Sequence, residues 1–190
     1  MMDFFRITNT RRSIRQFRQE PLDVNLLRKC VHSASLAPSA ANKQPLRYIL
    51  VTRRELCESV FPLLKWAGYI QPDGNPRKGF EPTAYLVILV HTEDQTRWSG
   101  HDAGAAVENF LLTIWSQGIG SCWIASVDRT RLSTLIPIPE GCKIDSIVAL
   151  GYPAEEPIQE SNSETIRYWK DKQNVLHVPK LPLDEILTVM

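Results

Sequence analysis

HDAGAAVENFLLTIWSQGIGSCWIAS, residues 101–126, predicts a long amphipathic helix that runs into a strand. Over residues 102–117 the apolar side chains recur at the i, i+3, i+4, i+7 and i+8 positions of a helix. Gly118 and Gly120 end this helix, and a short strand is expected over residues 121–125. Only small residues stand between Ala103 and Ala106, so another backbone can approach the first turns of the helix closely.

The rest of the chain alternates helices and strands around this stretch. We expect helices over residues 23–36 and after Arg54 and Asp128, and strands over residues 47–52, 84–92 and 144–151. Residues 84–92 form a continuous apolar run, which is typical of a strand covered on both faces. Residues 68–82 and 154–164 are expected to be irregular. This order predicts an α+β or α/β sandwich with helices packed on a central sheet.

Composition places the chain among ordinary globular proteins. It has 190 residues, with 22 Lys+Arg against 21 Asp+Glu, and 43% of its residues are hydrophobic. That length suits one domain, or one domain with an arm. The near-zero net charge argues against nucleic acid or an anionic membrane as a partner, and the longest apolar run, residues 84–90, is too short to span a bilayer. Because the N-terminus has no signal-peptide pattern, we expect a soluble cytoplasmic protein.

Cysteine and histidine are too scattered to predict a metal site. The four cysteines include no CxxC pair, and the four histidines do not complete a zinc signature. We therefore expect no bound metal and thiols that serve mainly as small packing residues. The chain also lacks a Walker A motif, a zincin H-E-x-x-H, a G-x-S-x-G nucleophile elbow and the Rossmann G-x-G-x-x-G.

A cluster of arginines near the N-terminus is the first candidate binding site. Five arginines fall within thirteen residues that contain no acidic residue: Arg6, Arg11, Arg12, Arg15 and Arg18. One interpretation is a solvated helix end, where each charge contributes only about 0–1 kcal/mol. The other is an anion site, in which guanidinium groups and the Ser13 hydroxyl bind one phosphate.

Two loops rich in small residues are further candidates. Residues 37–45 (APSAANKQP) connect a helix to a strand, and Asn42 and Gln44 place amide donors and acceptors just before that strand. Residues 118–126 (GIGSCWIAS) also permit a ligand to approach the backbone. Taken alone, the first loop is more often a turn filled with polar residues, and the second is a weak signal.

Together, and in this order, these segments resemble the nitroreductase family of FMN-dependent oxidoreductases. The resemblance runs through RRSIRQF (11–17), APSAANKQPLRY (37–48), the stretch 101–126 and VALGYPAEEP (148–157). It implies an α+β fold, a three-layer α/β/α sandwich around a mostly antiparallel central sheet. It also implies an intertwined homodimer with two FMN molecules at the subunit interface.

The same resemblance implies which residues hold the charged end of the cofactor. Arg11 and Ser13 match the positions that bind the FMN phosphate, with Arg12 beside them. Arg15 matches the basic position near the flavin N1 and the C2 carbonyl. Lys180 stands where relatives supply a cation for the phosphate.

A second set matches positions around the flavin ring. Pro38, Ser39 and Ala40 match a backbone stretch that lies against the ring from the partner subunit. Asn42 and Gln44 match amides that hydrogen-bond the flavin or its ribityl chain. The strand end whose backbone faces the ring near N5 is matched by three further residues, Ile124, Ala125 and Ser126.

The resemblance therefore implies an NAD(P)H-dependent enzyme in which FMN, and no protein residue, performs the chemistry. NADH or NADPH passes hydride to the flavin and leaves, and an electron-poor acceptor such as a nitroaromatic or a quinone takes its place, which is a ping-pong scheme. One alternative is a specialised flavoenzyme on the same fold, such as an enone reductase, a ring oxidase or a flavin-fragmenting enzyme. An alternative of a different class is a non-catalytic domain that binds anions or nucleic acid.

The C-terminal region differs in character from the rest. Residues 1–157 are expected to form the FMN-binding domain, and residues 158–190 a C-terminal arm with an apolar end. Because a polar tether precedes an apolar segment that must be buried, we expect the arm to pack on a second subunit. The alternative is that the arm packs on its own domain.

Overall fold

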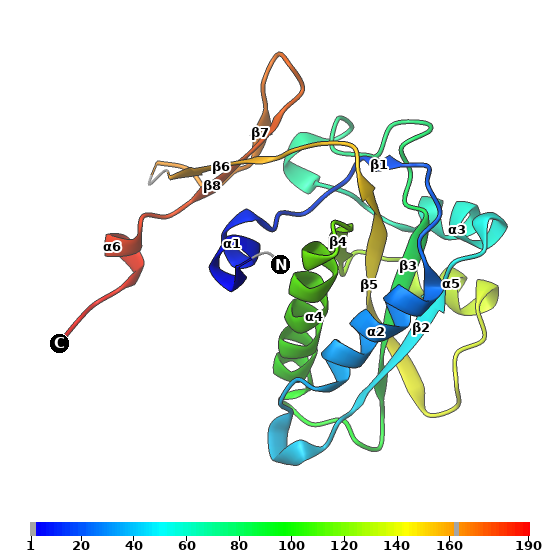
Figure 1. The fold of residues 1–190 in the computed structure, drawn as a ribbon. Coiled ribbons are helices and arrows are strands. Elements are labelled where there is room, and N and C mark those ends of the chain that lie inside the picture. The colour runs from blue at the N-terminus through cyan, green and yellow to red at the C-terminus, as the bar shows by residue number, and fades with distance from the viewer. Residues whose placement is uncertain (1–2, 162–163) are drawn as a thin grey trace.

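The computed structural model describes residues 3–161 and 164–190 and is built around one antiparallel sheet (Figure 1). Met1 and Met2 of the N-terminal stretch, and Asn162 and Ser163 of the polar segment, lie outside the described residues. The sheet runs in the order β1 (Phe17–Arg18), β5 (Cys142–Pro153), β3 (Ala84–His91), β2 (Leu46–Val51), and β4 (Gly120–Ile124) also pairs with β5. All of these pairs are antiparallel.

Helices cover both faces of this sheet. On one face, α2 (Val24–Ser35) and α4 (Ser99–Ser116) pack against Leu86 and Val148. On the other face, α3 (Arg54–Val60) and α5 (Arg129–Leu135) pack against Val87 and Ile147. Successive side chains of β3 point into the hydrophobic cores on opposite faces of the sheet. Because both faces are buried, the whole strand is apolar. The predicted three-layer α/β/α sandwich is confirmed.

Two predicted helix starts are confirmed by capping hydrogen bonds. The Asp23 side chain accepts a hydrogen bond from the backbone N–H of Asn25 at the start of α2. Asp128 accepts one from the N–H of Arg131 at the start of α5. A carboxylate in this position satisfies backbone donors that the helix itself leaves unpaired.

The structure corrects the predicted elements mainly at their ends. α4 begins at Ser99, three residues before the predicted start, and β5 covers 12 residues rather than the predicted eight. The N-terminal segment forms a helix, α1 (Phe4–Thr10), that was not predicted. Short 3-10 turns occur at η1 (Ala40–Asn42), η2 (Phe61–Leu63) and η3 (Gly68–Ile70). The prediction that residues 154–164 are irregular was wrong for β6 (Ile158–Ser161), because this strand depends on pairing with a distant strand.

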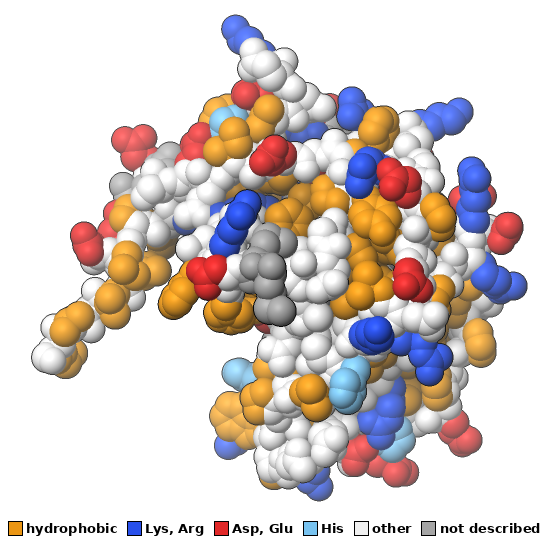
Figure 2. Space-filling view, in the orientation of Figure 1, with side chains coloured by type: hydrophobic (Ala, Val, Ile, Leu, Met, Phe, Trp, Pro, Cys, Tyr) orange, Lys and Arg blue, Asp and Glu red, His pale blue; other side chains and the backbone are white. Residues whose placement is uncertain are grey.

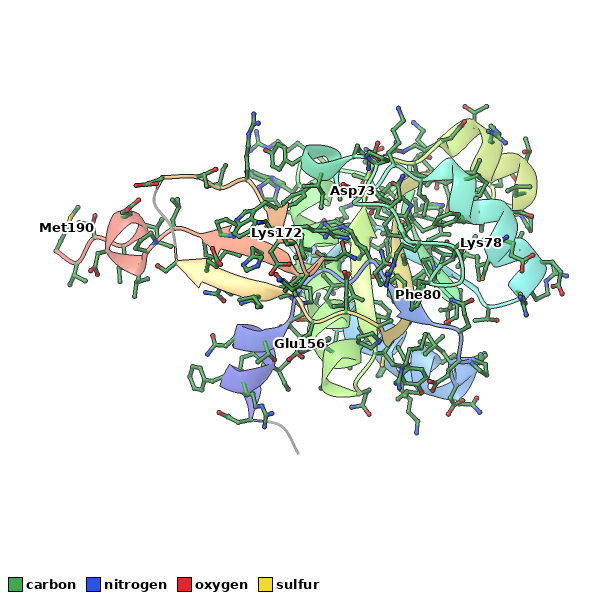
Figure 3. All side chains as sticks on the ribbon, turned by 90° about the horizontal axis from the view of Figure 1, so that it is seen from above. Asp73, Lys78, Phe80, Glu156, Lys172 and Met190 are labelled. Carbon is green, nitrogen blue, oxygen red and sulfur yellow. The ribbon has the colours of Figure 1, made fainter. Side chains whose placement is uncertain are left out.

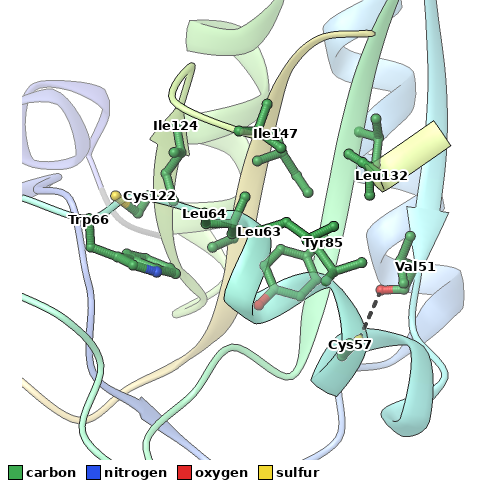
Figure 4. Close-up of a cluster of buried hydrophobic side chains, with 14 of the residues drawn as sticks. Val51, Cys57, Leu63, Leu64, Trp66, Tyr85, Cys122, Ile124, Leu132 and Ile147 are labelled. Atoms are coloured by element: carbon green, nitrogen blue, oxygen red, sulfur yellow. Dashed lines mark hydrogen bonds between the residues drawn. The ribbon is translucent and has the colours of Figure 1, made fainter. Parts of the chain in front are cut away.

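The core under α3 and α5 contains groups that burial keeps neutral (Figure 4). Tyr85 is completely buried, and burial raises the pKa of its phenol. The Cys57 thiol lies 3.6 Å from the carbonyl oxygen of Val51, and burial raises its pKa to about 11. Cys30 and Cys122 are also buried, whereas Cys142 is half-buried. The thiols therefore fit the predicted packing role.

The C-terminal segment forms a second, small sheet and then leaves the body of the molecule. Its order is β6, β8 (Leu176–Lys180), β7 (Trp169–Lys170), with β6 parallel to β8. After α6 (Leu183–Ile186) the chain ends in an apolar tail that stands away from the rest (Figures 2 and 3). Among the described residues of this end, Leu183 is 63% and Val189 85% exposed. No helix among the described residues is long and apolar enough to cross a membrane.

One histidine links the strands of this small sheet. The His177 ring stacks on Trp169 with centroids 4.0 Å apart, and its Nδ1 lies 2.6 Å from Glu160 Oε1. Its Nε2 lies 3.3 Å from Asp171 Oδ2. The hydrogen bond to Glu160, followed by that to Asp171, raises the pKa of His177. The contacts of His177 with the two carboxylates are therefore strongest when the imidazole is charged. They weaken as the pH rises through the raised pKa of His177.

Replacing Gly151 with alanine should destabilise the fold by about 1–2 kcal/mol, because the added methyl group overpacks a full site. A Cβ at Gly151 would lie 2.8 Å from Phe17, which is completely buried. A Cβ at Gly100 would meet nothing within 4 Å, so Gly100→Ala is the matched control. Urea unfolding measures both, and equal stability of Gly151→Ala and wild type would contradict the close contact.

Candidate functional site

Arg6 lies within α1, and Arg11 and Arg12 follow this helix beside the C-terminal half of α4. Arg11 caps the C-terminus of α1. The Trp115 indole N–H donates to Thr10 Oγ1 at 2.9 Å, which fixes the end of α1 against α4. Arg11 Nε lies 3.3 Å from Glu108 Oε1 on α4. These contacts anchor the start of the cluster.

Arg12 points into a cavity of about 750 Å³ where the C-terminal segment leaves the domain. Its guanidinium donates to the side chain of Gln159 in β6 and, at 2.5 Å, to the carbonyl oxygen of Arg11. Trp115 and Glu155 also line this cavity. Burial, and after it the like charge of Arg11, lowers the pKa of Arg12. Both effects indicate a place where an anion would be stabilising.

Ser13 and Arg15 lie against β4. The backbone N–H of Ile14 donates to the carbonyl oxygen of Ser121 at 2.9 Å, which brings the chain alongside this strand. The side chains of Ser13 and Arg15 both lie close to the buried Cys122 thiol. Burial raises the pKa of this thiol, and the charge of Arg15 opposes the rise only in part. Cys122 therefore serves as a neutral contact for Arg15.

Glu155 holds the backbone turn that presents Arg15. Its Oε1 accepts hydrogen bonds from the backbone N–H groups of Arg15 and Gln16, the latter at 3.2 Å. Gln16 is itself buried, and its side chain is tied to the backbone of Asn75 and Arg77. The turn is therefore anchored by two segments distant in the sequence.

Two buried guanidinium nitrogens of the cluster have neither a hydrogen bond nor an ion pair among the described residues. They are the Nε atoms of Arg12 and Arg15; the Nε of Arg11 also makes no hydrogen bond, but it lies 3.3 Å from the Glu108 carboxylate. A buried donor without an acceptor costs free energy on the order of 1–3 kcal/mol, more when it is charged. An oxyanion placed between these groups would supply the missing acceptors and offset their mutual repulsion. The cluster therefore offers the donors and the positive charge that a phosphate would need.

The loop between α2 and β2 forms a second, separate group. Ala41, Asn42 and Gln44 have positive φ angles of 51°, 52° and 47°, a conformation that costs residues other than glycine free energy. Side-chain acceptors help to hold it: the Ala40 N–H donates to Asp102 Oδ1 at 2.8 Å, and the Gln44 N–H donates to Ser39 Oγ at 3.0 Å.

A small cavity of about 110 Å³ lies beside this loop, lined among others by Pro38, Ser39, Gln44 and Asp102. Asp102 is 5% exposed, and its second oxygen, Oδ2, has no partner among the described residues. The Gln44 amide also donates to Asn42 Oδ1 at 3.1 Å. The loop thus presents backbone and amide groups in a strained, pre-formed arrangement.

The two groups lie at different ends of α4 within one chain. Thr10 contacts Trp115 near the C-terminus of this helix, whereas Ala40 contacts Asp102 near its N-terminus. Thirteen residues of helix span about 20 Å. Figure 1 shows the same separation, with α1 beside the upper part of α4 and the α2–β2 loop at its lower end. One chain therefore does not bring the arginine cluster and the loop together.

The remaining predicted residues occupy two further places. Ile124 ends β4, and the exposed Ala125 and Ser126 follow it; the Ser126 carbonyl accepts the Lys65 N–H at 3.0 Å. This segment continues the strand that carries Cys122, so it lies about 10 Å along the strand from the Arg15 contact. Lys180 ends β8 in the C-terminal segment, where it is exposed and makes no side-chain hydrogen bond or ion pair with the described residues.

Reasoning from the sequence missed several residues that shape the site. Glu155 lies in VALGYPAEEP beside a second glutamate, Glu156. The sequence gave no reason to expect a structural role for one of the two rather than the other. Asp102 lies at the predicted start of the long helix, and its position there gave no sign that it accepts a hydrogen bond from the backbone of the α2–β2 loop. Tyr168, whose ring lies 5.4 Å from the guanidinium carbon of Arg15, comes from the distant C-terminal segment. No local pattern could have revealed these contacts.

Comparisons with known proteins agree with this fold. Residues 8–152 match the model of the nitroreductase family. The chain is 31% identical, over 82% of its length and 88% of the relative's, to an Archaeoglobus fulgidus protein provisionally named NADH dehydrogenase/NAD(P)H nitroreductase. It is 28% identical to an NADH dehydrogenase of Thermus thermophilus, over 84% of this chain and 92% of that one. A Desulfovibrio desulfuricans structure, described as a nitroreductase in complex with FMN, superposes with a TM-score of 0.70 at 21% identity and covers 100% of this chain and 98% of its own.

Proposed function

Because this chain belongs to the nitroreductase family, we propose that it is an FMN-dependent oxidoreductase. It transfers reducing equivalents from NADH or NADPH, through the flavin, to an electron-poor acceptor such as a nitroaromatic or a quinone. The observation that carries the proposal is the pair of buried guanidinium nitrogens without an acceptor, at Arg12 and Arg15, beside the charge of Arg11. We place this activity in the cytoplasm.

The residues present fit the cofactor at its charged end. A phosphate carries a charge of about −2 and several acceptor oxygens, which Arg11, Arg12 and the Ser13 hydroxyl bind in this proposal. Arg15 faces the flavin N1 and C2 carbonyl, where its charge favours the reduced, anionic ring over the oxidised one. When bound, FMN accepts hydride from the nicotinamide and passes the electrons to the acceptor.

The other site residues act through backbone and amide groups. Pro38, Ser39 and Ala40 lie flat against the ring, and Asn42 and Gln44 hydrogen-bond the flavin or its ribityl chain. The strand end from Ile124 through Ala125 to Ser126 faces the ring near N5. None of these groups needs to gain or lose a proton, which is consistent with chemistry carried by the cofactor.

We propose that the site is completed by a second copy of the chain. The arginine cluster and the α2–β2 loop lie about 20 Å apart along α4, so the loop of one subunit serves the arginines of the other. In this arrangement residues 1–157 form the FMN-binding domain. Residues 158–190 form the C-terminal arm. Its residues 167–170 contact their own domain, and its exposed apolar end is buried on the partner subunit in this proposal. Lys180 would approach the phosphate only as part of this arm.

The visible spectrum of purified protein incubated with FMN tests the function. We expect flavin absorption that stays with the protein through gel filtration, bleaches with NADH or NADPH without oxygen, and returns on adding a nitroaromatic or a quinone. Parallel lines in double-reciprocal plots would support the ping-pong scheme. A colourless protein, or one that binds nucleic acid with a steep salt dependence and no flavin, would contradict it.

Dilution tests the shared site. Flavin and dimer should be lost together when the protein is diluted, because each flavin is held by both chains. Analytical ultracentrifugation with detection of flavin absorbance measures this coupling. An FMN-loaded, active monomer would contradict the proposal that the α2–β2 loop acts across the interface.

A further inference from the structure

The guanidinium of Arg15 is covered by an aromatic ring from the C-terminal segment. Its carbon atom Cζ lies 5.4 Å from the centroid of the Tyr168 ring, within cation–π range. The backbone N–H of Arg15 donates to Glu155, whereas the buried Nε of its side chain makes no hydrogen bond with the described residues. One face of the guanidinium is therefore occupied while one edge donor stays available.

Tyr168 is in turn held by residues far away in the sequence. Its ring lies 5.0 Å from that of Tyr69, tilted by 48°, and the guanidinium of Arg167 lies 5.3 Å from the Tyr69 ring centroid. The Lys170 ammonium donates to the carbonyl oxygen of Asp73 at 2.9 Å. These contacts fasten residues 167–170 to the segment around η3, so the Tyr168 ring has a fixed support.

We propose that Tyr168 is a positioning residue for Arg15, an inference that rests on the proposed function. The ring fixes the guanidinium in the orientation that directs its free edge at the flavin N1 and C2 carbonyl. Tyr168 acts through Arg15 and does not touch the reacting atoms.

The physical reason is the flexibility of arginine. A free arginine side chain populates many rotamers, and the loss of rotamer entropy opposes holding it in one. A ring on the guanidinium face removes part of that freedom, while the N–H donors, which lie in the guanidinium plane, remain available for hydrogen bonds. Arg15 is then already ordered before the cofactor binds, so less of the binding free energy is spent on ordering it.

The experiment measures FMN affinity and flavin potential in Tyr168→Leu and Tyr168→Phe. Tyr168→Leu should raise the dissociation constant for FMN about fivefold and lower the midpoint potential, because the disordered guanidinium stabilises the reduced flavin less. Tyr168→Phe keeps the ring and should bind FMN as wild type does. Fluorescence quenching of FMN gives the affinity, and equilibration with redox dyes gives the potential.

The chain offers a matched control in a second cation–π pair. The guanidinium of Arg18 lies 5.3 Å from the Tyr152 ring centroid, and neither residue has a role in the proposed site. Tyr152→Leu therefore removes an equivalent contact and should leave FMN affinity and potential unchanged. A loss equal to that in Tyr168→Leu would overturn the proposal, because it would indicate a general effect on stability.

A double-mutant cycle separates action through Arg15 from a direct or purely structural role. In an Arg15→Ala background, Tyr168→Leu should add nothing to the loss of affinity or to the shift in potential. A full fivefold loss in that background would overturn the inference, as would wild-type affinity and potential in Tyr168→Leu itself. Neither outcome contradicts the proposed function. A wild-type protein that binds no FMN would contradict it.

Discussion

Arg15→Ala should raise the dissociation constant for FMN about tenfold and lower the two-electron potential of the bound flavin by about 30–60 mV. A guanidinium about 4 Å from the negative end of the reduced ring, at an effective dielectric constant near 20, interacts with it by about 4 kcal/mol before desolvation. A net loss of about 1.4 kcal/mol corresponds to tenfold in affinity. For a two-electron couple the same energy corresponds to about 30 mV.

The direction of the potential shift identifies the role of Arg15. A cation that contacted only the phosphate would change affinity equally for both redox states and leave the potential where it was. Arg18→Ala is the matched control, because Arg18 is exposed and pairs with Glu20 outside the proposed site. Unchanged affinity and potential in Arg15→Ala would show that Arg15 does not face the flavin.

Asp102→Leu should weaken FMN binding tenfold or more by releasing the α2–β2 loop. The substitution removes the only hydrogen bond found from Asp102 to that loop among the described residues, the 2.8 Å contact between Ala40 N and Asp102 Oδ1. A buried N–H left without an acceptor costs about 1–3 kcal/mol, and the strained residues Ala41, Asn42 and Gln44 then relax. Faster hydrogen exchange at Ala40, together with FMN titration, measures the effect.

Asp102→Asn is the matched control for this prediction. Asparagine keeps an acceptor oxygen at the same place and removes a buried charge, one of whose oxygens has no partner among the described residues. We expect the loop to stay ordered and FMN affinity to stay within about twofold of wild type, because the hydrogen bond is retained. If asparagine and leucine were equally damaging, the carboxylate charge, and not the hydrogen bond to Ala40, would be what the site requires.

Local patterns in the sequence were sufficient for most helices and strands. The apolar spacing of α4 predicts a helix, because a helix on a sheet buries one apolar stripe. The continuous apolar run of β3 predicts a central strand, because such a strand is buried on both faces. The caps at Asp23 and Asp128 are local contacts between near neighbours, so sequence alone could identify them. β6 could not be identified in this way, because its partner β8 lies beyond a turn and another strand.

By itself the sequence determined the fold class, the family resemblance and which residue types could bind an anion. Only the tertiary structure decided how those residues are arranged: Arg11 contacts Glu108 near one end of α4, Arg15 lies close to Cys122 of β4, and Ala40 and its loop lie at the other end of α4. It also brought Tyr168 and Glu155 to Arg15 from about 140 residues or more away. The physical reason is that helix and strand periodicity is encoded by neighbours in the chain, whereas contacts around a guanidinium depend on how distant segments pack.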